Sequence, residues 1–204
     1  MSYQVSSQSL SRALRVFSVA VWVMAVGVGI WILLRYSNTP GAAATPPLRW
    51  PSDTSIQRVK DHATLVVFAH PQCPCSEASI EELAHIVADS RERLDVYVLF
   101  YAPEQKTDEW VRGRLWRNAA IVPGLHAIED RNGVEVRRFR VGTSGQALLY
   151  DTAGFLRFNG GITASRGHSG GNDGRDAIVS FTMHGSSRRA TTPVFGCSLL
   201  GGSG

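Results

Sequence analysis

The chain has 204 residues, enough for one globular domain with additional segments, because single domains usually run to about 100–150 residues. Apolar residues make up 44% and charged residues 19%, which argues against intrinsic disorder. The net charge is +4, but the basic residues occur singly or in pairs such as Arg137-Arg138 and Arg188-Arg189. Nucleic-acid binding normally needs a clustered basic surface, so none is expected. Three cysteines are too few for a disulfide-stapled scaffold.

The amino-terminal part contains an apolar run, Val16 to Leu34, without a charged residue. As a helix it would span about 28 Å, close to the ~30 Å hydrocarbon core of a bilayer. Arg12 and Arg15 precede the run and Arg35 follows it, which favours a cytoplasmic tail over residues 1–15. A cleaved signal peptide is the alternative, but its apolar core usually has only about 7–15 residues. We therefore predict an uncleaved single-pass anchor at 16–34 in the inner (cytoplasmic) membrane, with the remainder on the periplasmic or extracytoplasmic side.

The rest of the chain divides by composition into three parts. Residues 35–54 are rich in proline and lack a regular period, which is typical of an extended linker. Residues 55–185 contain the periodic apolar segments of a folded domain. Residues 186–204 are expected to be a loose tail apart from the segment that ends at Cys197.

The domain begins with a strand, a helix and a second strand. Thr64 to Ala69 is β-branched and apolar, as in a strand buried on both faces. Ser76 is expected to cap the helix that follows. The predicted core face of this helix consists of Ile80, Leu83 and Val87, and its predicted solvent face of Glu81, Glu82 and Asp89. The second strand, Asp95 to Tyr101, completes a right-handed parallel crossover.

The remaining pattern contains further helices and a hairpin. Thr107 to Ala120 is a second helix candidate, and Asn132-Gly133 is a turn followed by a segment without a predicted structure. Gln146 to Tyr150 and Phe155 to Asn159 flank a turn sequence and predict paired strands. Asp176 to Met183 is the predicted last helix. The order of elements predicts an α/β domain.

Two cysteines lie between the first strand and the first helix of the domain. In Cys73-Pro74-Cys75 both thiols precede the helical pattern, and His70 lies three residues before Cys73. Backbone N–H groups and the helix dipole at such a position stabilise a thiolate and lower its pKa. A redox pair is predicted, and two incidental buried thiols beside a turn proline are the alternative.

The stretch LVVFAHPQCPCSEASIEEL resembles the active-site region of membrane-anchored periplasmic thioredoxin-like proteins of the TlpA/ResA type, and the RedB-like group is expected to be nearest. QALLYDTAGFLRFNGGI is similar to the terminal hairpin of that family, so the resemblance covers residues 64–183. It implies a thioredoxin-like fold with a central mixed sheet flanked by helices. It also implies thiol–disulfide exchange with a protein partner, in which Cys73 attacks and Cys75 resolves without a cofactor.

The sequence departs from this family at two places. The family pair is Cys-x-x-Cys, whereas one residue separates Cys73 from Cys75, and strain in so tight a ring should make the pair comparatively oxidising. The family also has a cis-proline before the hairpin, where this chain has Gly142 to Gly145. Since that proline loop normally holds the partner strand, the mode of substrate docking stays open.

The loop after the hairpin should lie near Cys73, because the second hairpin strand runs toward the cysteine end. It contains Arg166, which could stabilise a thiolate, and His168, which could transfer a proton or be a solvated loop residue. Cys197 could resolve a mixed disulfide at Cys73, pair with a partner protein, or pack beside its apolar neighbours, and packing is the expectation.

Two other functions remain open for the same residues. Cys73, Cys75 and His168 form a soft donor set suited to copper(I), with His70 as a further candidate ligand. The exported copper chaperones of cytochrome oxidase assembly are similar in outline, although three residues separate their cysteines. A redox-inactive thioredoxin-like scaffold that only binds a partner is the third hypothesis.

Overall fold

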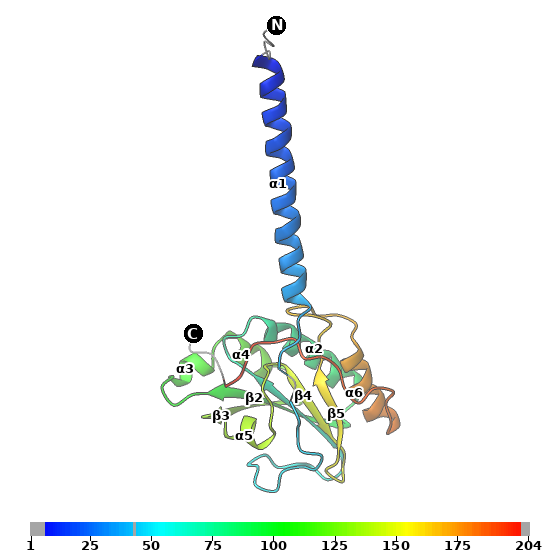
Figure 1. Cartoon of the computed structure of the whole chain (residues 1–204). Helices are drawn as coiled ribbons and strands as arrows, with labels where there is room; N and C mark the ends of the chain where they lie inside the picture. The colour runs from blue at the N-terminus through cyan, green and yellow to red at the C-terminus, as the bar shows by residue number, and fades with distance from the viewer. Residues whose placement is uncertain (1–6, 43, 201–204) are drawn as a thin grey trace. The chain divides into compact units, whose positions relative to one another are not determined.

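The computed structural model describes residues 7–42 and 44–200, with side chains from Leu10 onward. The chain forms two compact units, Met1–Asn38 and Thr39–Gly204 (Figure 1). The first unit consists of helix α1, Ser7–Ser37, whose apolar side chains are exposed along its length. A helix that is apolar around its whole circumference has no single face to bury against a soluble core. By length and composition, Leu10–Ser37 can cross a membrane, as the sequence predicted.

The second unit is built on a five-stranded mixed sheet in the order β3-β2-β1-β4-β5. The strands are β1 Ala63–Ala69, β2 Leu94–Ala102, β3 Leu125–Arg131, β4 Gln146–Tyr150 and β5 Leu156–Gly161. β1, β2 and β3 are parallel, whereas β4 is antiparallel to both β1 and β5. All seven residues of β1 are buried, as its apolar sequence predicts for a central strand. The predicted parallel crossover and terminal hairpin are therefore confirmed.

Helices cover the two faces of the sheet unequally. The helices of this unit are α2 Cys75–Asp89, α3 Asp108–Val111, α4 Arg114–Ala120, α5 Val134–Arg138 and α6 Asp173–His184. Alternate residues of β1 point to opposite faces, so that Leu65 and Val67 pack under α2, α4 and α6. Val66 and Phe68 pack on the other face, with Phe139 beside α5 and with Trp50. The cysteine loop follows the carboxyl end of β1 and leads directly into α2.

Several local predictions differ from the structure. The single helix predicted over Thr107 to Ala120 is interrupted at Gly113, whose extended backbone precedes α4. Pro74, not Ser76, occupies the amino-terminal cap of α2, and Ser76 lies inside the first turn. α6 begins at Asp173, earlier than predicted, because the Asn172 side chain accepts a hydrogen bond from the Arg175 N–H.

Glu82 was predicted on the solvent face of its helix and is instead fully buried. Its carboxylate accepts hydrogen bonds from the Gly170 N–H and from the Asn172 side chain, and lies 3.6 Å from the Arg175 guanidinium. A buried carboxylate is tolerated only with such partners. Glu82 therefore joins α2 to the loop before α6, and the sequence pattern of α2 alone did not reveal this role.

The predicted linker is extended, but part of it is bound along the domain. The Pro47 carbonyl accepts a hydrogen bond from the Tyr150 hydroxyl at 2.9 Å, and the Trp50 N–H donates to the Gly154 carbonyl at 2.8 Å. The Trp50 ring meets Tyr150 edge-on. The part of the linker from Pro47 to Trp50 is thus bound to the folded unit and is not a free spacer.

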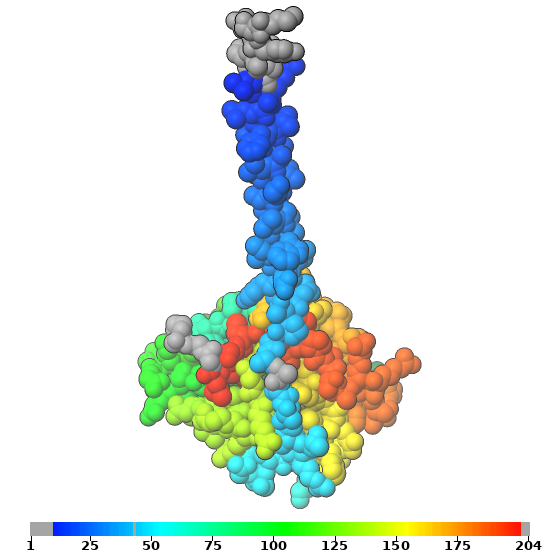
Figure 2. Space-filling model, viewed as in Figure 1, coloured from blue at the N-terminus to red at the C-terminus, as the bar shows by residue number. Residues whose placement is uncertain are grey.

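The tail after α6 was expected to be loose, and it too packs on the domain. The Asn159 N–H donates to the Ala190 carbonyl, and the Thr192 hydroxyl donates to the Gly161 carbonyl at 2.7 Å. Farther on, the tail lies beside the chain that follows Thr39, since the Gly41 N–H donates to the Val194 carbonyl (Figure 2). The tail therefore runs along the edge strand β5 and continues toward the cysteine loop.

Candidate functional site

Cys73 lies in the loop that connects the central strand β1 to α2. The loop is closed by a hydrogen bond from the Cys73 N–H to the His70 carbonyl at 3.0 Å, and the Gln72 N–H donates to the His70 ring at 3.2 Å. Cys75 is the first residue of α2, and the Cys73 side chain is only 4% exposed. The structure thus places the pair at a helix start, although Cys73 is covered and Cys75 is half-buried.

A third sulfur covers Cys73. The Sγ atom of Cys197 lies 2.9 Å from the Sγ atom of Cys73. The expectation that Cys197 only packs beside apolar neighbours is therefore wrong. No local pattern around Cys197 predicts this contact, because 124 positions separate the two cysteines.

The surroundings of Cys73 favour its thiolate. Burial alone would raise the pKa of Cys73, but four hydrogen-bond donors oppose it. These are the Cys197 thiol, the Cys197 N–H, the Ser76 hydroxyl and the Cys75 N–H. Together they hold the pKa of Cys73 below its ordinary value, as donors to a thiolate do.

The other two thiols are shifted in the opposite direction. Burial and the charge of Cys73 raise the pKa of Cys75, although the nearby Arg166 guanidinium lowers it in part. Burial, followed by the hydrogen bond to Cys73 and the charges of Cys73 and Cys75, raises the pKa of Cys197 to about 12. Of the three sulfurs, Cys73 is therefore the one prepared to act as a nucleophile.

A pair of hydroxyls ties the cysteine loop to the segment before β4. The Ser144 hydroxyl oxygen accepts the His70 N–H at 2.8 Å and lies 2.7 Å from the buried Ser76 hydroxyl oxygen. Ser144 lies in the stretch where the resembling family has its cis-proline, so this chain joins the two loops by side-chain hydrogen bonds. Nothing local in the sequence distinguishes Ser144 from other loop serines, so its role could not be predicted.

The tail docks on the same segment by backbone hydrogen bonds. The Ser144 N–H donates to the Cys197 carbonyl at 2.8 Å, and the Leu199 N–H donates to the Gly142 carbonyl at 2.9 Å. Thr143 and Ser198 form an antiparallel bridge between these bonds. A Cβ atom at Gly196 would overlap the Ser144 carbonyl oxygen, so the close approach needs glycine there.

Arg166 and His168 lie on the loop that follows β5. Gly161 at the end of β5 pairs with Gln146 of β4, and Gln146 pairs with Phe68 near the end of β1. As predicted, β5 therefore ends beside the cysteine loop that follows β1. Arg166 donates to the Gly196 carbonyl at 2.6 Å and to the Thr39 carbonyl at 3.3 Å. Arg166 thus lies close enough to Cys75 to affect its pKa and also binds the tail.

His168 is exposed, and its ring Nδ1 lies 3.5 Å from the Arg166 carbonyl of its own loop. The half-buried His70 ring packs against Trp110 and Tyr101, and burial lowers its pKa. Among the described residues, no group of three histidine, cysteine or acidic side chains is arranged to hold a metal ion. The roles predicted for His168 and His70 stay predictions.

A small cleft reaches Cys73 from the side of α4. Its volume is about 140 Å³. The residues lining it are Pro71, Gln72, Cys73, Pro74, Glu77, Arg114 and Leu115. Arg114 forms an ion pair with Glu77 at its rim. Among the described residues that line the cleft, none comes from the tail, so the cleft and Cys197 reach Cys73 from different elements.

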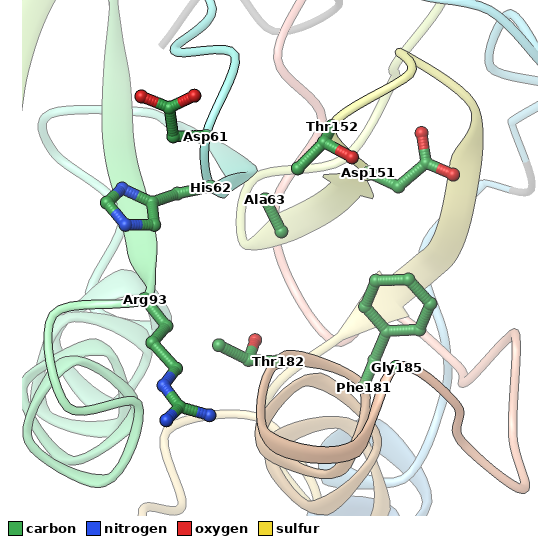
Figure 3. Close-up of a pocket in the computed structure, with 9 residues that line it drawn as sticks. All are labelled: Asp61, His62, Ala63, Arg93, Asp151, Thr152, Phe181, Thr182 and Gly185. Carbon is green, nitrogen blue, oxygen red and sulfur yellow. The ribbon is translucent and has the colours of Figure 1, made fainter.

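A larger pocket of about 440 Å³ lies at the other end of β1, around Ala63 (Figure 3). Asp151 and Thr152 line it after β4, and Phe181 lines it from α6 (Figure 3). None of its described lining residues is a cysteine. Volume therefore does not mark the site with the thiol chemistry.

The sheet and the cysteine loop together define a class of domain. A central strand parallel to one neighbour and antiparallel to a terminal hairpin on its other side, with a helix starting at a cysteine loop, is the thioredoxin-like fold. The fold predicted from the resemblance is thus present, preceded by one apolar helix.

Comparisons with known proteins find similar structures at low sequence identity. A hypothetical protein from Sinorhizobium meliloti 1021 has a similar structure, with a TM-score of 0.59, 21% identity, and coverage of 82% of this chain and 97% of that one. An uncharacterized conserved protein from Geobacillus kaustophilus has a TM-score of 0.58, 15% identity, and coverage of 82% and 96%. The exposed lipoprotein thioredoxin of Streptococcus pneumoniae strain TIGR4 matches with a TM-score of 0.45, 16% identity, and coverage of 61% and 85%. No family model matches the chain, and no curated protein sequence is similar to it.

Proposed function

We propose that this protein is a thiol–disulfide oxidoreductase in which Cys73 is the attacking sulfur. The observation that carries the proposal is the place of Cys73 in the loop at the start of α2, where its sulfur lies 2.9 Å from that of Cys197. The hydrogen bonds to Cys73 also lower the pKa of its thiol. A thiolate, not a thiol, attacks a disulfide. A cleft beside Cys73 offers an approach for a substrate sulfur.

The reaction proceeds in two exchanges. The Cys73 thiolate attacks one sulfur of a protein disulfide, forms a mixed disulfide, and releases the other substrate sulfur as a thiolate that takes up a proton. A second thiol of the site then attacks the Cys73 sulfur and releases the remaining substrate thiol. The Cys-Pro-Cys motif assigns this second step to Cys75, and the Arg166 guanidinium beside Cys75 would stabilise its thiolate. The oxidised site is reduced again by an external dithiol.

The placement of this chemistry follows from α1. We propose that α1 anchors the chain by a single pass in the cytoplasmic membrane and that the thioredoxin-like domain faces the extracytoplasmic side. Protein disulfides form and persist in oxidising compartments such as the extracytoplasmic side of this membrane, so substrates for exchange are present there. The likeness to TlpA/ResA-type proteins in the active-site stretch supports the same location.

The test is the exchange activity of a Cys73→Ser variant of the full chain in detergent. The parent protein is expected to accelerate the reduction of insulin by dithiothreitol. In Cys73→Ser this acceleration should fall by at least about a hundredfold, because serine cannot form the mixed disulfide. A far-ultraviolet circular dichroism melt should show that the variant folds like the parent. Full activity of the folded variant would refute the proposal.

Two alternatives use the same domain differently. A copper(I) chaperone would hold the metal with Cys73, Cys75 and His168, and stoichiometric copper(I) binding that disappears in His168→Ala would favour it. A redox-inactive scaffold would show neither copper binding nor exchange.

A further inference from the structure

We infer that Cys197 is the internal partner of Cys73, so that the oxidised site carries a Cys73–Cys197 disulfide and Cys75 keeps its thiol. The inference rests on the proposed function, because it names the second thiol of that reaction. It replaces the assignment of Cys75 that the Cys-Pro-Cys motif suggests. The observation behind it is the contact of 2.9 Å between the two sulfurs.

The contact is held by the backbone of the docked tail. Hydrogen bonds on both sides of the Thr143–Ser198 bridge fix the tail against the segment before β4. Arg166 binds the carbonyl just before Cys197, and only glycine fits at Gly196. An incidental thiol on a loose tail would have none of these constraints.

Ring geometry favours Cys197 over Cys75 as the bonding partner. A disulfide between Cys73 and Cys75 closes a tight ring across one residue, at a point where Cys75 is already fixed in the first turn of α2. Disulfides depend on a narrow range of torsion angles, and deviations store strain. Cys197 comes from a separate segment, so its bond to Cys73 closes no small ring. A bond of about 2.0 Å needs only a small approach of the two sulfurs.

The electrostatics order the two steps. The hydrogen bond to Cys73 and the charge of Cys73 are among the causes that raise the pKa of Cys197. When Cys73 enters a mixed disulfide, its negative charge and its acceptor role are removed. The Cys197 thiol then loses its proton more readily, to the departing substrate sulfur or to water. Cys197 is thus held back until substrate is bound to Cys73.

The exchange is balanced in atoms and electrons. The Cys197 thiolate attacks the Cys73 sulfur, the Cys73–substrate bond breaks, and the Cys73–Cys197 bond forms. The substrate disulfide gains two electrons and two protons, and the two cysteines lose them. The substrate sulfur enters through the cleft between the cysteine loop and α4, and Cys197 approaches from the tail. An external dithiol, dithiothreitol in the assay, returns the electrons.

Disulfide mapping tests the inference directly. The full chain in detergent is oxidised with oxidised glutathione, its free thiols are blocked with N-ethylmaleimide, and the tryptic peptides are identified by mass. Cys73 and Cys75 lie together in peptide 61–91, whereas Cys197 lies in peptide 190–204. The expected product is a cross-link between these two peptides with one blocked cysteine. An internal disulfide in peptide 61–91 with a blocked Cys197 would overturn the inference.

Two variants identify which sulfur of peptide 61–91 is bonded. The cross-link should persist in Cys75→Ser and disappear in Cys73→Ser. The rate of insulin reduction by Cys197→Ser should be about a tenth of that of the parent or less, because the resolving thiol is missing. The same variant should accumulate a mixed disulfide between insulin and Cys73. Cys75→Ser should not accumulate this mixed disulfide, because Cys197 can still release the substrate from Cys73.

A backbone variant separates docking of the tail from the sulfur itself. Gly196→Ala leaves all three cysteines in place but forces the tail away from Ser144. The yield of cross-link under a fixed glutathione ratio should fall by about tenfold, because the effective concentration of Cys197 at Cys73 drops. Gly171→Ala is the matched control, since a Cβ atom there meets open space. An unchanged yield in Gly196→Ala would contradict the docking argument.

The outcomes distinguish this inference from the proposed function. If Cys73→Ser stays fully active, the proposed function fails. If Cys73→Ser and Cys75→Ser are both inactive while Cys197→Ser turns over normally, the function stands and Cys197 is not the partner.

Discussion

At the scale of single residues, the reactivity of Cys73 depends on which groups point at its sulfur. The sequence predicted the helix start and therefore one source of thiolate stabilisation. It could not predict that the Cys197 thiol and N–H and the Ser76 hydroxyl would donate to the same sulfur. Such donors come from side-chain directions and from long-range docking, and neither leaves a periodic signal.

The Ser76 hydroxyl gives a prediction at this scale. In Ser76→Ala the Cys73 sulfur loses one donor, so the pKa of Cys73 should rise toward the value that burial alone would give. Since the thiolate is the reactive form, the half-maximum of the alkylation rate should move to higher pH. At a pH below the half-maximum, Cys73 of Ser76→Ala should be alkylated several-fold more slowly than Cys73 of the parent. The measurement is the pH profile of iodoacetamide labelling of Cys73, followed by mass spectrometry.

Ser79→Ala is the matched control, because it makes the same change at another buried position of α2. Among the contacts of the described residues, none joins Ser79 to the Cys73 sulfur. Equal profiles for Ser76→Ala and the parent would show that the Ser76 hydroxyl does not stabilise the thiolate.

At the scale of elements, the sequence predicted β1, β2 and the β4–β5 hairpin but missed the edge strand β3. β1 and β2 have β-branched, apolar sequences because they are buried, and the hairpin has turn residues between two short runs. β3 was not predicted, because its sequence LHAIEDR contains three charged residues and no regular alternation. Of these three, Arg131 is exposed, whereas Asp130 is buried and accepts hydrogen bonds from the Glu135 and Val136 N–H groups. The break between α3 and α4 at Gly113 depends on one extended residue, which the apolar period does not reveal.

Glu82 shows that a charged residue in a helical pattern can be buried when other segments supply its partners. Glu82→Ala should lower the free energy of unfolding by about 2–3 kcal/mol, because it leaves buried donors at Gly170 and Asn172 without an acceptor. Urea unfolding of the full chain measures the change. Glu81→Ala, one residue earlier and exposed, should change it by less than about 0.5 kcal/mol. Equal effects of the two variants would show that the contacts of Glu82 contribute nothing to stability.

At the scale of the whole molecule, the site is assembled from segments that are far apart in the chain. The cysteine loop, the segment before β4, the loop with Arg166 and the tail meet at one edge of the sheet. The sequence located the first of these by composition and proposed the third from strand direction. It could not place the tail, because the tail binds the Gly142 carbonyl and the Ser144 N–H, backbone groups that nearly every residue type has. The need for glycine at Gly196 becomes visible only once the tail is seen against Ser144.

The arrangement makes stability depend on the redox state, which is the final prediction. A Cys73–Cys197 disulfide would close a loop across 124 positions and restrict the unfolded chain, with a contribution of about 4–5 kcal/mol in the chain-entropy model. A Cys73–Cys75 disulfide would contribute only roughly 1–2 kcal/mol before strain is subtracted. For a unit of this size, oxidation should therefore raise the midpoint of thermal unfolding by about 10 °C.

The measurement compares melts of the diamide-oxidised and phosphine-reduced full chain in detergent. Cys75→Ser should keep the difference between the two melts, and Cys197→Ser should abolish it. A difference that survives in Cys197→Ser and vanishes in Cys75→Ser would mean that the tight ring forms in preference to the long loop. The docked tail would then protect Cys73 without bonding to it.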